Sequence, residues 1–79
     1  MNRNKIEVEL GVARVEEGGE EDRGTWGVIR YVINAPIVIP PNQTEQDLVK
    51  MEGIRKFWEA NAEDHFVANL WLYHYEYLP

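Results

Sequence analysis

Three segments of this 79-residue chain alternate between two kinds of side chain, and only one segment repeats with helical spacing. The alternating segments are 5–12, 25–34 and 66–77, and the helical segment is 44–62. Successive side chains of a strand point to opposite faces of a sheet, whereas residues three and four apart share one face of a helix. The pattern therefore predicts a small sheet that a single helix covers on one side.

The first two alternating segments are joined by an acidic stretch that contains Gly18-Gly19. Two glycines suit the central positions of a type I′ hairpin turn, because both positions need positive φ. A hairpin centred there gathers the aliphatic side chains of both strands on one face. On the other face it pairs Glu7 with Arg30, and it places the ring of Trp26 opposite Gly11. Opposite charges and a ring over a glycine are favourable cross-strand neighbours.

Segment 44–62 has the start signals and the periodicity of an amphipathic helix. Thr44 followed by Asp47 fits a capping box, and Asn42 followed by Glu45 is an alternative start. One apolar stripe then follows the three- and four-residue spacing. Its members are Leu48, Met51, Ile54, Phe57 and Trp58. We expect this stripe to cover the aliphatic face of the sheet.

The last segment, about 66–77, separates aliphatic side chains from aromatic ones. Its even positions begin with Phe66, Ala68, Leu70 and Leu72, and rings occupy the odd positions from Trp71 onward. If the segment is a strand, these rings form one row on one face of the sheet. The row consists of Trp71, Tyr73, Tyr75 and Tyr77.

The face opposite the helix is therefore predicted to be aromatic and open. Each Trp or Tyr can bury about 150–250 Å², so several together exceed the apolar patch that a monomer normally exposes. We expect this face to bind a protein partner with a basic or apolar surface. The candidate partner-binding residues are Trp26, Arg30, Trp71, Tyr73, Tyr75 and Tyr77. The alternative is that the chain covers its own rings with the segment 35–41, in which Ile37 to Ile39 is a candidate third strand.

The chain is acidic, with 14 Asp and Glu against 8 Lys and Arg and a formal charge of −6. This balance disfavours nucleic-acid backbones and anionic membrane surfaces. Half of the acidic residues fall between Glu7 and Asp22, and the predicted hairpin tip at 16–24 is especially rich in them. We expect the tip to be mobile and to steer the chain toward a basic surface, although a solvated loop is the simpler interpretation. The steering residues are Glu16, Glu17, Glu20, Glu21 and Asp22.

Catalytic and cofactor motifs do not occur in this sequence. The chain has no Cys and no Ser, and its glycine-rich stretch is flanked by carboxylates that would repel a phosphate. His74 and Glu76, with Glu63, Asp64 and His65 upstream, are the one set to weigh as metal ligands or an acid–base pair. A turn histidine and a polar strand end are the simpler interpretation, so we expect no catalytic residue, no metal and no cofactor.

Together these features predict one α+β domain spanning 1–79, in the order β-β-(β)-α-β. Its sheet has three or four mainly antiparallel strands with one helix on one face. Without an apolar stretch of about 20 residues or a signal-peptide core, a cytoplasmic location is expected.

The predicted function is a non-catalytic protein-binding module, an inhibitor or adaptor. In size and charge the chain is similar to the small inhibitors that phages and other mobile elements make, anti-CRISPR proteins among them, although no motif carries this analogy. Three alternatives remain open. They are a homodimer formed by two open faces, a single-stranded nucleic-acid binder that stacks bases on Trp and Tyr, and a small metal-dependent enzyme or ligand-binding fold.

Overall fold

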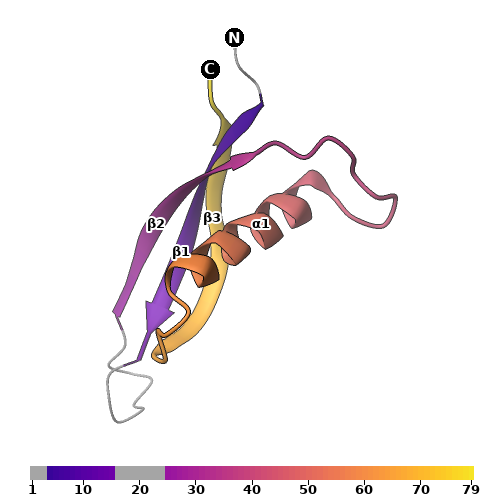
Figure 1. Ribbon diagram of the computed structural model, residues 1–79. Coiled ribbons are helices and arrows are strands. Elements are labelled where there is room, and N and C mark those ends of the chain that lie inside the picture. Colours follow the sequence, from indigo (N-terminus) through magenta and orange to yellow (C-terminus); the bar gives the residue numbers. More distant parts are fainter. Residues whose placement is uncertain (1–3, 16–24) are drawn as a thin grey trace.

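A computed structural model describes residues 4–15 and 25–79, so the predicted acidic tip lies outside the described residues (Figure 1). The elements are β1 (Lys5–Arg14), β2 (Thr25–Asn34), α1 (Glu45–Ala60) and β3 (Val67–Tyr77). The three strands form one antiparallel sheet in the order β2-β1-β3, and α1 lies across one face of it. The predicted α+β class is confirmed, with β1 as the central strand. No helix in the described part of the chain is long and apolar enough to cross a membrane.

The segment between β2 and α1 is neither a strand nor a cover for the open face. Ile37 is 98% exposed, and Ile37 to Ile39 pairs with no described strand. Pro36 and Val38 instead lie beside Leu48 and Met51 of α1, on the helix side of the sheet. Both the optional third strand and self-coverage by this segment are therefore wrong. The prolines at its ends explain why it stays out of a ladder, since proline cannot donate a backbone hydrogen bond.

β1 and β2 pair over ten residues each without interruption, in a register two residues away from the predicted one. Arg30 lies opposite Glu9 rather than Glu7, and Gly11 lies opposite Val28 rather than Trp26. The prediction assumed a two-residue turn at the glycines, whereas the described ladder ends at Arg14 opposite Thr25. A shift of two residues preserves which face each side chain occupies, so the predicted faces of this hairpin are correct.

The helix begins at the predicted capping box. The Asp47 backbone N–H donates to Thr44 Oγ1 at 3.1 Å, and the Thr44 N–H donates to Asp47 Oδ2 at 3.0 Å. This confirms Thr44, rather than Asn42, as the N-cap. The backbone hydrogen bond from Thr44, followed by the bond from its side chain, lowers the pKa of Asp47 below its ordinary value.

The core lies between α1 and the even-numbered face of β1. Its buried members are Ile6, Val8, Leu10, Val12, Ile33, Val49 and Phe57. The helix contributes residues four apart, Val49, Gly53 and Phe57, so the predicted stripe was wrong for Met51, which is 58% exposed, and for the exposed Trp58. A Cβ on Gly53 would lie 3.0 Å from Val8 Cγ1, which shows that the glycine lets the helix approach the sheet closely.

Candidate protein-binding surface

A β-bulge divides β3 and decides which of its rings are covered. Leu72 lies opposite Leu10 and His74 lies opposite Glu9, so Tyr73 is an extra residue between two adjacent positions of β1. Beyond this bulge the alternation of β3 reverses. Tyr75 and Tyr77 therefore lie opposite core residues, on the face that α1 covers.

The predicted single row of four rings is thus wrong. Trp71, opposite Gly11, lies on the open face, whereas Tyr75 and Tyr77 do not. Tyr73 has no partner on β1; since it follows the core-facing Leu72 and is exposed, we assign its ring to the open face as well. His74 and Glu76 occupy the open face in their place. The sequence carried one signal of this change. The even positions of β3 turn from leucine to His and Glu at the point where tyrosines continue on the odd positions, so the apolar side chains change phase there.

A second register break, between Ala13 and Arg14, affects the start of β3 in the same way. Arg14 pairs with Val67, and Val67 packs against the core. Phe66, which simple alternation placed in the core, is exposed instead. Regular alternation therefore describes only the middle of this strand.

Tyr75 and Tyr77 are fixed to the first turn of α1. The Tyr75 hydroxyl donates to Glu45 Oε1 at 3.0 Å, and the Tyr77 hydroxyl donates to Glu45 Oε2 at 2.8 Å. Burial, and then the hydrogen bond to the carboxylate, raises the pKa of Tyr75; the hydrogen bond to Glu45 is the first cause of the raised pKa of Tyr77. These two rings hold β3 to the helix and lie outside the open face, so the open face has to be defined without them.

The remaining rings gather on the open face, which we call the aromatic face. It consists of Trp26, Val28, Val32, Trp71 and Tyr73. Trp26 is 64% exposed and Tyr73 is 56% exposed. The Trp26 and Trp71 rings come from the two edge strands and meet above β1, with centroids 6.1 Å apart and planes inclined at 46°. Such tilted pairs lie within the distance range in which aromatic rings attract each other.

Gly11 on the central strand provides the space for this ring pair. A Cβ built on Gly11 would overlap the indole of Trp71, so the ring lies directly against the backbone of β1. The predicted contact of a ring with this glycine therefore exists, but the ring is Trp71 of β3 rather than Trp26. Only glycine permits this close approach.

Charged side chains adjoin the aromatic face near the N-terminal half of β1. Arg30 Nε donates to Glu9 Oε2 at 3.2 Å, and Glu9 also lies opposite His74. Glu7 lies opposite Glu76. Lys5 lies on the same face, next to Glu7 along β1 and opposite Asn34. Three carboxylates against two basic side chains, Arg30 and Lys5, leave a formal charge of −1 on this group, with the histidine counted as neutral. The predicted site residue Arg30 is thus paired within the sheet, although its side chain remains 70% exposed.

The residues weighed as metal ligands do not form a cluster. Across 4–15 and 25–79, no three His, Asp or Glu side chains are grouped so that they could hold a metal ion. Asp64 accepts a hydrogen bond from Arg14 Nε at 2.7 Å, and this bond lowers the pKa of Asp64. The pair ties the turn before β3 to the end of β1, which is a structural role.

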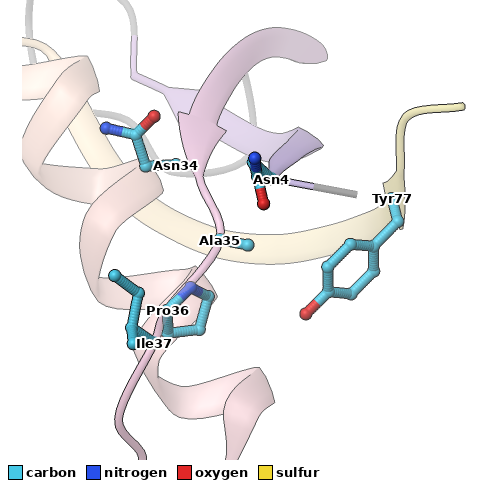
Figure 2. A pocket seen from close by; sticks show the side chains of 6 residues that line it. All are labelled: Asn4, Asn34, Ala35, Pro36, Ile37 and Tyr77. Atoms are coloured by element: carbon cyan, nitrogen blue, oxygen red, sulfur yellow. The ribbon is translucent and has the colours of Figure 1, made fainter. Parts of the chain in front are cut away.

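Two shallow pockets lie at the end of β2, away from the aromatic face. The larger, of about 470 Å³, is lined by Asn4, Asn34, Ala35, Pro36, Ile37 and Tyr77. Figure 2 shows the Tyr77 ring on one side of it and the chain segment with Pro36 and Ile37 on the other. Amides, one phenol and apolar groups line this pocket, and they supply hydrogen bonds but no acid–base pair. Neither pocket adds a residue to the aromatic face.

Comparison of the chain with protein-family models, with curated proteins and with solved structures finds no match. The surface is therefore interpreted from its own geometry and chemistry.

Proposed function

We propose that this chain is a non-catalytic protein-binding module, of the inhibitor or adaptor type, that binds its partner through the aromatic face. The observation that carries the proposal is the Trp26–Trp71 pair, held above the central strand on the side opposite α1. Exposed Trp and Tyr in contact with further apolar side chains are typical of interaction sites. Trp and Tyr are also enriched among the residues that dominate binding energy.

The sheet makes these rings well suited to binding. Trp71 rests on the backbone at Gly11 and Trp26 lies beside Trp71, so we expect the contacts within the chain to restrict both rings before a partner arrives. Ordering side chains at an interface costs about 0.5–1.5 kcal/mol for each rotamer-rich group. A preformed ring pair reduces this cost, so more of the burial energy contributes to affinity.

The charges beside the rings indicate the chemistry of the partner. Glu7, Glu9 and Glu76 leave the neighbouring surface slightly negative, because Arg30 and Lys5 offset only two of the three carboxylates. We expect a protein with an apolar groove for the indoles and with Lys or Arg at its rim. A nucleic-acid strand stacked on the same rings would bring its phosphates toward three carboxylates, which weakens that alternative.

The test is a pull-down from the native host with three baits, followed by affinity measurements on the purified partner. The baits are the wild type, the double variant Trp26→Ala/Tyr73→Ala, and the control Trp58→Ala, which removes an exposed ring from α1. We expect the double variant to lose the partner and the control to retain it. Equal retention by all three folded baits would refute binding through the aromatic face.

A further inference from the structure

The two edges of the sheet differ in how well they are protected. β3 is interrupted by two register breaks, whereas β2 pairs with β1 without any. β2 contains no Lys and no Pro, and Arg30 is its one charged residue. Bulges, lysines and prolines are the usual means by which proteins prevent edge strands from pairing with other chains. Among the described strands, only the outer edge of β2 is long, regular and without these features.

The register shows which backbone groups of β2 face outward. The Ala35 N–H donates to the Asn4 carbonyl at 2.8 Å, which continues the β1–β2 ladder by one pair. Hydrogen-bonded pairs alternate along antiparallel strands, so the odd-numbered residues of β2 bond to β1. The even-numbered residues Trp26, Val28, Arg30 and Val32 therefore direct their N–H and C=O groups to the free edge. The side chains of the same residues lie on the open face.

We infer that a second copy of this chain pairs with the free edge of β2, antiparallel and about a two-fold axis at Ile29. In this register Ile29 faces its own copy, Val28 faces Arg30, and Trp26 faces Val32. Every outward-facing backbone N–H and C=O from Trp26 to Val32 then forms a hydrogen bond with the β2 strand of the other copy. Two three-stranded sheets join into one sheet of six strands.

The side chains of β2 favour this register over its neighbours. Gly27 faces Tyr31, and no heavy atom lies within 4 Å of a Cβ built on Gly27, so the ring of the other copy has space. The exposed Trp26 packs against the exposed Val32, and such aromatic–β-branched pairs are favourable.

The two neighbouring registers are poorer. Centring the axis on Arg30 would place two guanidinium groups directly opposite each other, which is unfavourable. Centring it on Val28 would shorten the ladder, because the strand begins at Thr25.

The arrangement has a consequence for binding. A two-fold axis at an antiparallel pair stands perpendicular to the sheet, so both aromatic faces lie on the same side. A dimer would therefore present a continuous surface with two Trp26–Trp71 pairs. The inference rests on the edge of β2 and holds whether or not the aromatic face binds another protein.

Cysteine cross-linking tests the register, because the chain has no cysteine of its own. Directly opposed residues of a non-hydrogen-bonded pair have Cα atoms about 4.5 Å apart, which lies within the disulfide range of about 4.4–6.8 Å. Under mild oxidation we expect Ile29→Cys to form a disulfide dimer at least about tenfold faster than Val28→Cys or Arg30→Cys. Equal rates for the three variants, or faster reaction at position 28 or 30, would overturn the inference.

Sedimentation equilibrium tests the edge itself. In the single chain the Val28 N–H faces outward, so Val28→Pro removes no bond to β1, yet it blocks pairing with a second copy. We expect Val28→Pro to raise the dimer dissociation constant at least about tenfold, and Val28→Lys to act in the same direction if the proline variant does not fold. A wild type that remains monomeric at about millimolar concentration would overturn the inference.

A matched control separates this inference from the proposed function. Tyr73 lies on β3, away from the β2 edge, so Tyr73→Ala should leave the dimer constant unchanged while it weakens partner binding. A loss of the dimer in Tyr73→Ala would instead indicate face-to-face association and would contradict pairing through β2.

Discussion

Two pairs of rings in this protein, Tyr75 with Tyr77 and Trp26 with Trp71, lie on opposite faces of one sheet. The tyrosines are half-buried and donate hydrogen bonds to the Glu45 carboxylate of α1. The tryptophans contact each other above Gly11, and no described element lies over them. Tyr75, Tyr77 and Trp71 all occupy odd positions of one alternating segment, so their different environments come from the bulge at Tyr73. One extra residue decides which rings fasten the helix and which stay available for a partner.

The covered face should be far less tolerant of truncation than the open face, and this is the largest effect we expect. Val8 is fully buried and Val28 is exposed, so the same change to alanine compares the two faces directly. Val8→Ala should lower the free energy of unfolding by about 2–3 kcal/mol, from lost burial and the cavity left behind. Val28→Ala should change it by less than about 0.5 kcal/mol. Urea denaturation measures both, and similar losses would show that the open face is also core.

A methyl group at Gly11 should displace the tryptophan pair. The Cβ of Gly11→Ala would overlap the Trp71 indole, so the ring must move and lose its contact with Trp26. Overpacking of this kind costs about 1–3 kcal/mol. Near-ultraviolet circular dichroism should lose the signal of the ring pair, and partner binding should weaken. An unchanged aromatic spectrum in the folded variant would contradict the contact.

Deletion of Tyr73 should leave the tyrosine anchor in place, with a smaller loss of stability. Removing the extra residue lets Leu72, His74 and Tyr75 pair in unbroken register with Leu10, Glu9 and Val8. Tyr75 and Tyr77 then keep their face and their bonds to Glu45, and only the open face loses a ring. Amide exchange of the β3 backbone and tyrosine titration should resemble those of the wild type. If β3 had no bulge, the same deletion would move Tyr75 and Tyr77 to the other face of the sheet. Amide exchange and tyrosine titration would then both differ from the wild type.

Glu45→Gln should have the smallest effect, which is visible mainly at alkaline pH. The raised pKa values of Tyr75 and Tyr77 mean that the folded state favours the neutral phenols. The neutral phenols therefore add to the free energy of unfolding. This stabilisation is fully present below the ordinary tyrosine pKa of about 10, and it is lost as the pH rises through the raised pKa values of the two tyrosines.

The variant removes the carboxylate charge that helps to raise both pKa values. Tyrosinate absorbance should therefore appear at lower pH than in the wild type, and stability should fall less steeply as the pH increases above about 9. Identical titration curves for the two proteins would show that Glu45 does not contact these hydroxyls.

Local signals in the sequence were enough to predict the fold class, the N-cap of α1 and the two faces of the first hairpin. Thr44 with Asp47 specifies a helix start through contacts three residues apart, so no tertiary information is needed. The prediction that Tyr75 and Tyr77 lie on the open face was wrong because of the bulge at Tyr73. The bulge depends on how β3 pairs with β1, and the sequence of β3 alone does not specify that pairing. Strict alternation of rings is equally consistent with a regular strand and with a bulged one.

The errors on the helix and in the hairpin have similar causes. Val49, Gly53 and Phe57 face β1 along one line of residues four apart, and the prediction followed the larger side chains of Met51 and Trp58 instead. Which line of an amphipathic helix is buried depends on where it crosses the sheet. The hairpin register likewise depended on a turn position that the glycines alone do not specify.

The central claim is that the exposed Trp26 and the half-buried Trp71 both become covered further in the complex. The variant Trp58→Phe leaves these two as the tryptophans of the protein, so its fluorescence reports on the aromatic face alone. Titration with the purified partner should shift the emission to shorter wavelength and protect it from acrylamide quenching. Adding Trp26→Ala should weaken the affinity at least about tenfold, or about 1.4 kcal/mol. If acrylamide quenches the fluorescence equally well in the free chain and at a saturating concentration of the partner, the claim that the partner covers these rings is contradicted.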